Sequence, residues 1–178
     1  MLLAILIFSL LGRQRPAGLP SSASGLVDAA ESGYDKDANK IISSEFDGVI
    51  LAETEDAGEE YVDNTLFIGD SNTYRMVAMG KTTWQNNLSA VGMGIGHRTA
   101  LQQIHEAYPY ADIIINSIPP VAQRRSYPNI TMKTIDAFNK ALVEMAKEEG
   151  YTFLNSAEVL KDSTGYAKAE YMESSDGI

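Results

Sequence analysis

The sequence predicts an α/β fold built on a parallel sheet, and three observations support this. Short apolar runs alternate with amphipathic, helix-like stretches between residues 65 and 155. Two of these runs end in glycine-containing turns, at Gly69 and Gly94. The chain has 178 residues, 44% of them hydrophobic, so it can bury a sizeable core. Strands that alternate with helices pair in parallel and are covered by helices on both faces.

Four apolar runs are the expected strands, and three amphipathic stretches are the expected helices. The strands are 65–69, 88–91, 112–118 and 151–155. The helices are 73–79, 99–108 and 131–149. Gly80 and Gly150 follow the first and third helices as natural C-terminal stops, and Pro109 ends the second. In such folds, ligands bind at the carboxyl ends of the strands.

The chain is expected to have three parts. Residues 1–12 are apolar and precede Arg13 and Arg15, which favours a secretory or membrane-anchor segment. The alternative is an apolar N-terminal helix packed on the domain. Residues 13–52 are mostly rich in Ser, Gly, Ala, Pro and Asp, which is typical of a linker. An acidic run opens the expected folded domain, 53–178.

The composition excludes several classes of function. Acidic residues outnumber Lys and Arg by 24 to 14, a net charge of −10, so nucleic acid is not an expected partner. The chain has no cysteine, which excludes disulfides, thiolate metal sites and a cysteine nucleophile. No metal-ligand spacing is present, and we expect neither a metal nor a cofactor. Imidazole chemistry is restricted to His97 and His105.

The stretch 63–75 is the most informative for chemistry, because a serine follows a buried strand and leads into a helix. The Ser71 hydroxyl is then at the carboxyl end of the strand. Its backbone N–H is one of the unsatisfied donors of the helix N-terminus, where it can stabilise an oxyanion. Gly69 permits a tight turn. The alternative role for Ser71 or Asp70 is simply to cap the helix.

The motif Gly69-Asp70-Ser71 after an apolar strand resembles the nucleophile block of the SGNH/GDSL hydrolases. The resemblance runs from about residue 64 to the end of the chain. It implies a three-layer, flavodoxin-like α/β/α fold and ester hydrolysis by a Ser-His-Asp arrangement. It assigns Ser71 as nucleophile, Ser71 and Gly94 as oxyanion-hole donors, and Asp176 as the aspartate of an Asp-x-x-His block.

The sequence departs from that family in two places. The histidine of Asp-x-x-His belongs three residues after Asp176, and the chain ends at Ile178. The family's Gly-x-Asn-Asp block is also missing, and Asn116 lacks its glycine and aspartate. Only one helix fits between Gly96 and the third apolar run, so we expect a central strand to be lacking near His97. Its loss would separate the flanking strands or make them pair directly.

The resulting expectation is a serine esterase acting on short acyl esters, such as O-acyl groups of surface carbohydrate, inactive as this fragment. Its setting would be extracellular or membrane-anchored, facing outside. One alternative is a non-catalytic carbohydrate-binding module on the same scaffold. Another alternative is that residues 69–73 form a phosphate-binding loop for a flavin mononucleotide. The loop has only one glycine and places an acidic residue where the anion would bind, which disfavours this alternative.

Overall fold

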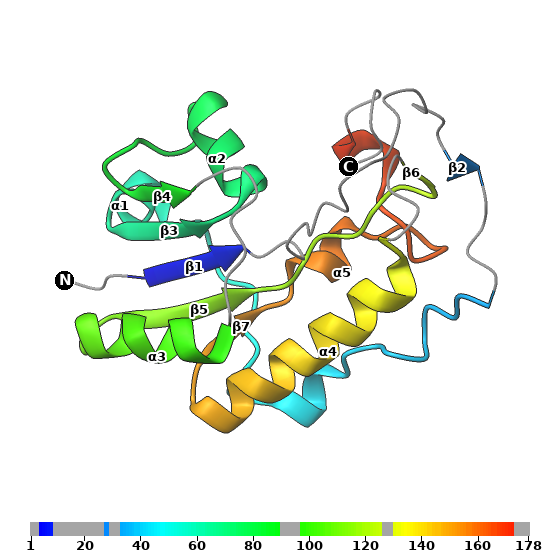
Figure 1. Cartoon of the computed structure of the whole chain (residues 1–178), viewed down its shortest axis with the longest axis horizontal. Coiled ribbons are helices and arrows are strands. Elements are labelled where there is room, and N and C mark those ends of the chain that lie inside the picture. The colour runs from blue at the N-terminus through cyan, green and yellow to red at the C-terminus, as the bar shows by residue number, and fades with distance from the viewer. Residues whose placement is uncertain (1–3, 9–26, 29–32, 90–96, 126–129, 173–178) are drawn as a thin grey trace, which may run out of the picture.

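Five parallel strands form the sheet that organises the chain, in the order β4-β3-β1-β5-β7 (Figure 1). The computed structural model describes residues 4–8, 27–28, 33–89, 97–125 and 130–172. The strands are β1 (Ala4–Phe8), β3 (Thr65–Gly69), β4 (Asn87–Ser89), β5 (Asp112–Asn116) and β7 (Thr152–Leu154). Four of them correspond to the four predicted runs. The predicted parallel α/β class is therefore confirmed, whereas the three-layer flavodoxin-like arrangement stays a prediction.

The strand at the centre of the sheet, β1, comes from the apolar start of the sequence. It pairs with β3 from Ala4 opposite Thr65 to Phe8 opposite Gly69, and with β5 on its other side. The sequence predicts that residues 1–12 are a secretory or anchor segment, or alternatively a helix packed on the domain. Residues 4–8 instead form a strand, because a run of five aliphatic and aromatic residues suits the interior of a parallel sheet.

The expected gap in the sheet is consequently absent. The strands that would flank a missing central strand, β3 and β5, neither separate nor pair directly. Both make their parallel ladder with β1, which takes the central position. In Figure 1 the dark blue arrow of β1 lies between β3 and β5.

The helices agree with the predicted periodicity, and additional short ones were not predicted. They are α1 (Gly58–Asp63), α2 (Ser71–Ala78), α3 (His97–Ala107), α4 (Met132–Glu149) and α5 (Ser156–Leu160), with 3₁₀ turns η1 (Ser43–Phe46) and η2 (Ala169–Tyr171). A small antiparallel pair joins β2 (Val27–Asp28) to β6 (Arg124–Arg125). The longest helix, α4, begins where the Thr131 hydroxyl accepts the Thr134 N–H and ends at Gly150, with φ +76°.

The core joins one face of the sheet to α3 and α4. Its strand residues alternate along the sequence, as one face of a sheet requires. They are Ile68, Ile113, Ile115 and Phe153. The helices contribute Leu101 from α3 and Ile135, Leu142, Val143 and Ala146 from α4.

Part of the expected linker belongs to the folded domain. Ile41 and Phe46 are buried in the core. The Leu51 N–H donates to the Phe153 carbonyl at 2.9 Å, and the Phe153 N–H donates to the Val49 carbonyl at 2.8 Å. The linker interpretation is therefore wrong for residues 33–52, because their scattered apolar side chains pack on α4 and β7. Residues 13–26 and 29–32 lie outside the described residues.

In the described part of the chain, no helix combines the length and apolar character needed to cross a bilayer.

Candidate functional site

Ser71 is the first residue of α2 and lies directly beyond the carboxyl end of β3. Between them, Asp70 is buried, and its carboxylate accepts the Asn72 N–H at 3.0 Å. The Asp70 carbonyl accepts the Tyr74 N–H at 2.9 Å, the first backbone bond of the helix. Asp70 thus caps α2, which leaves the part-buried Ser71 hydroxyl free of that role. The capping role that the sequence allowed for either residue therefore belongs to Asp70, and the nucleophile role of Ser71 stays a prediction.

Buried amides attach α2 to the edge of the sheet next to β3. The Asn87 side chain donates to the Thr73 carbonyl at 2.9 Å and to the Thr82 hydroxyl at 3.0 Å. The Ser89 hydroxyl in turn donates to Asn87 Oδ1. Because Thr73 is in the same helical turn as Ser71, this network fixes the first turn of α2 against β4.

The helix start offers one of the two predicted oxyanion donors. Among the described residues, none accepts a hydrogen bond from the Ser71 N–H. The donor sits at the positive end of an eight-residue helix, where a developing negative charge is stabilised. The second expected donor, Gly94, lies outside the described residues, and so does Asp176.

His105 is not brought to Ser71. Its ring packs edge-on against the Tyr151 ring, with 6.3 Å between centroids. Tyr151 immediately precedes β7, at the amino end of that strand, whereas Ser71 follows the carboxyl end of β3. Because the five strands are parallel, Tyr151 and Ser71 lie at opposite ends of the strands.

His97 is the first residue of α3, and its side chain lies outside the described residues. The next residue, Arg98, forms ion pairs with Glu148 and Glu149 at the end of α4, and these carboxylates raise the pKa of its guanidinium. These ion pairs join the start of α3 to the C-terminal end of α4, which is followed by the amino end of β7.

Asn116 lies in the same row of the sheet as the residues before Ser71, but two strands away. The register aligns Gly69 with Phe8, and Ile115 with Ile7, so Asn116 is level with Gly69. With β1 between them, the axes of β3 and β5 are about 10 Å apart, twice the usual strand spacing. Asn116 Oδ1 accepts the Ser156 hydroxyl at 2.7 Å, which fixes the amide at this edge.

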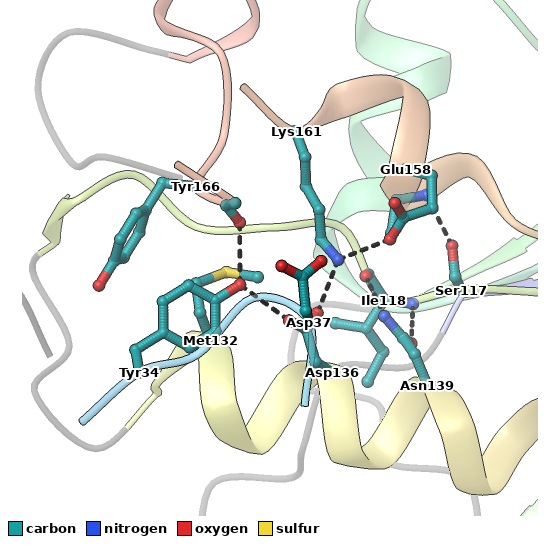
Figure 2. Close-up of polar contacts among 12 residues, drawn as sticks. Tyr34, Asp37, Ser117, Ile118, Met132, Asp136, Asn139, Glu158, Lys161 and Tyr166 are labelled. Carbon is teal, nitrogen blue, oxygen red and sulfur yellow. Dashed lines mark hydrogen bonds and ion pairs between the residues drawn. The ribbon is translucent and has the colours of Figure 1, made fainter. Parts of the chain in front are cut away.

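A buried ionic cluster near the carboxyl end of β7 was missed by sequence reasoning (Figure 2). Lys161 Nζ lies 2.9 Å from Asp136 Oδ1 and 2.7 Å from Glu158 Oε1. The Tyr34 hydroxyl donates to Asp136 Oδ2 at 2.8 Å. Burial lowers the pKa of Lys161, but its bonds and ion pairs with Glu158 and Asp136 raise it more, to above 10.5.

The members of this cluster come from separate parts of the chain: the segment before η1, α4, α5 and the residue that follows it. The i,i+3 spacing of Glu158 and Lys161 signals their ion pair, but nothing in the sequence signals that they meet Tyr34 and Asp136. The lysine is 11% exposed and the aspartate 4% exposed, and Lys161 compensates the buried carboxylate, whereas the second carboxylate, Glu158, is 38% exposed. We assign the cluster a structural role, joining residue 34 and the C-terminal loop to α4. Among the described residues, no group of three or more acidic or histidine side chains is arranged to hold a metal ion.

Comparison with known proteins gives no match to a protein-family model, a curated protein or a solved structure.

Proposed function

We propose that this chain is a serine ester hydrolase of the SGNH/GDSL type, acting on short acyl esters such as O-acyl groups of carbohydrate. The observation that carries the proposal is the position of Ser71. It follows the carboxyl end of β3 and opens α2 with its own N–H unused by the described residues. The motif Gly69-Asp70-Ser71 adds the family resemblance. The flavodoxin-like layering and an extracellular setting are parts of the same proposal, although residues 4–8 belong to β1 and do not act as an anchor.

In the proposed reaction, Ser71 Oγ bonds to the acyl carbon while its proton passes to a histidine. The carbonyl oxygen becomes an oxyanion, held by the Ser71 N–H and by the Gly94 N–H. The histidine then gives the proton to the leaving alcohol, and water releases the acid from the acyl-enzyme by the reverse proton path. Asp176 orients the histidine, which the family pattern places three residues later.

A one-residue extension tests this assignment directly. A histidine added after Ile178 completes Asp176-Gly-Ile-His, so a general base becomes available. We expect turnover of p-nitrophenyl acetate to rise roughly a hundredfold or more over that of a chain extended by alanine. Ser71→Ala in the histidine-extended chain is expected to abolish the gain. Equal turnover with and without the Ser71 hydroxyl would exclude the nucleophile assignment.

The second candidate function is a non-catalytic carbohydrate-binding module. The position of His105 near the amino ends of the strands favours the binding module, because no described imidazole reaches Ser71 at their carboxyl ends. This candidate predicts that the histidine-extended chain gains no turnover, yet binds the same carbohydrate as the unextended chain. Equilibrium binding of an O-acetylated xylo-oligosaccharide to both chains distinguishes the two functions.

A further inference from the structure

Two exposed aromatic rings lie beside the start of α2. Tyr74 is 41% exposed and Trp84 is 57% exposed. Their rings meet edge to face, with centroids 5.3 Å apart and planes inclined by 60°. Together they expose aromatic surface on the flank of the helix that begins with Ser71.

Helix geometry places this aromatic pair next to the nucleophile. Tyr74 is three residues after Ser71 in α2, so both side chains are on one side of the helix. Residues at this spacing have Cβ atoms about 5–6 Å apart. A ligand whose acyl carbon meets Ser71 therefore extends over the two rings within the length of one or two sugar units.

The loop that carries Trp84 is fixed by buried polar side chains. Asn86 donates its amide to the Val62 carbonyl at 2.9 Å and accepts the Thr83 N–H at 2.9 Å. Thr82 receives the Asn87 amide at 3.0 Å. The indole is thus exposed on a rigid support, so binding would require little ordering of this loop.

We propose that Tyr74 and Trp84 form a subsite for an uncharged sugar ring of the ester that Ser71 attacks, an inference that rests on the proposed function. Aromatic faces carry negative charge density and attract the polarised C–H groups of a sugar. The net charge of −10 disfavours a polyanionic ligand.

Leu88, an exposed apolar residue of the edge strand β4, does not extend the aromatic pair. Its neighbour Asn87 points to α2, and successive side chains of a strand point to opposite faces, so Leu88 faces away from α2.

Trp84 is the single tryptophan of the chain, so its fluorescence reports binding directly. We would titrate the Ser71→Ala protein, which cannot turn the ester over, with an O-acetylated xylo-oligosaccharide. The expected result is a saturable change in emission. Tyr74→Ala should weaken binding at least roughly tenfold, whereas Tyr110→Ala, which alters a tyrosine that is 94% exposed elsewhere, should leave it unchanged. An emission change caused by self-association, identified by sedimentation, would overturn the proposal, as would no change at all.

Kinetics in the histidine-extended chain separate this inference from the proposed function. Trp84→Ala should lower kcat/KM for the acetylated oligosaccharide roughly tenfold more than it lowers kcat/KM for p-nitrophenyl acetate, which lacks the sugar. An equal loss on both substrates would refute the subsite while leaving the esterase assignment intact. Sugar binding that depends on Tyr74 and Trp84 without any turnover would refute the esterase and keep the subsite.

Discussion

The Tyr34 hydroxyl donates a 2.8 Å hydrogen bond to the Asp136 carboxylate on α4, across 102 residues of sequence. Tyr34→Phe keeps the ring packing against Tyr166 and removes the hydroxyl, which also donates a longer 3.3 Å bond to the Gly165 carbonyl. A hydrogen bond to a charged group stabilises by about 2 kcal/mol, so we expect the free energy of unfolding in urea to fall by that amount. Tyr110→Phe, at an exposed position, is the matched control and should change nothing.

Replacing the buried lysine of the ionic cluster should be more damaging. Lys161→Met leaves Asp136, which is 4% exposed, without its cation. Removing one partner of a buried ion pair costs about 3–5 kcal/mol. Urea denaturation of this variant is compared with that of Lys81→Met, which alters an exposed lysine. A loss no larger than that of the control would contradict the cluster's structural role.

The same lysine predicts how stability depends on alkaline pH. The pKa of Lys161 is raised above its ordinary 10.5 because the carboxylates of Glu158 and Asp136 outweigh the effect of burial. The folded state therefore holds the proton more tightly than the unfolded state. The stability difference between wild type and Lys161→Met should be constant from pH 7 to just below the ordinary pKa of 10.5 and shrink as the pH rises through the folded pKa. Urea midpoints measured from pH 7 upward test this.

Gly165 adopts a backbone conformation that other residues rarely take, and it lies against Tyr34. Its φ is +90°, and an added Cβ would come within 2.6 Å of the Tyr34 hydroxyl oxygen. Gly165→Ala should destabilise the fold by about 2–3 kcal/mol. Gly80→Ala is the control for backbone strain alone, since Gly80 has φ +67° with open space around it. We expect it to cost about 1 kcal/mol, and thermal unfolding of both variants should rank them in this order.

Asp70 offers a test of the link between helix capping and catalysis. Asp70→Ala removes the acceptor for the Asn72 N–H, which should cost about 1 kcal/mol of stability. In the histidine-extended chain it should also lower turnover of p-nitrophenyl acetate, because Ser71 is then less firmly held. Asp70→Asn keeps an acceptor oxygen and should retain more of both. If the two variants lost equal activity, the carboxylate charge rather than the cap would matter.

Local sequence signals predicted most of the sheet. Strands such as Thr65–Gly69 and Asp112–Asn116 are short apolar runs next to glycine, proline or polar turns, so their hydrophobic pattern is sufficient. The helix Met132–Glu149 is bounded by a threonine cap and a glycine stop. In each case the information lies within the element itself.

Features that depend on distant contacts were not predictable in this way. An apolar run such as Ala4–Phe8 suits an export segment as well as a strand, and only pairing with β3 and β5 distinguishes them. The cluster of Tyr34, Asp136 and Lys161 joins residues that are far apart in sequence. In the candidate site, the position of Ser71 followed from its flanking strand and helix. The exclusion of His105 needed the edge-on contact with Tyr151.

The position of β1 has a consequence for synthesis on the ribosome. Its five residues emerge well before either neighbouring strand, and the second neighbour is complete only at Asn116. Until then, an aliphatic segment with high β-propensity is exposed on the nascent chain, where it can bind chaperones or pair with other chains. The centre of the sheet is thus completed by the capture of its earliest segment, and only β7 is added later. Slowing translation before residue 116 should lengthen the time during which the nascent chain is prone to aggregate.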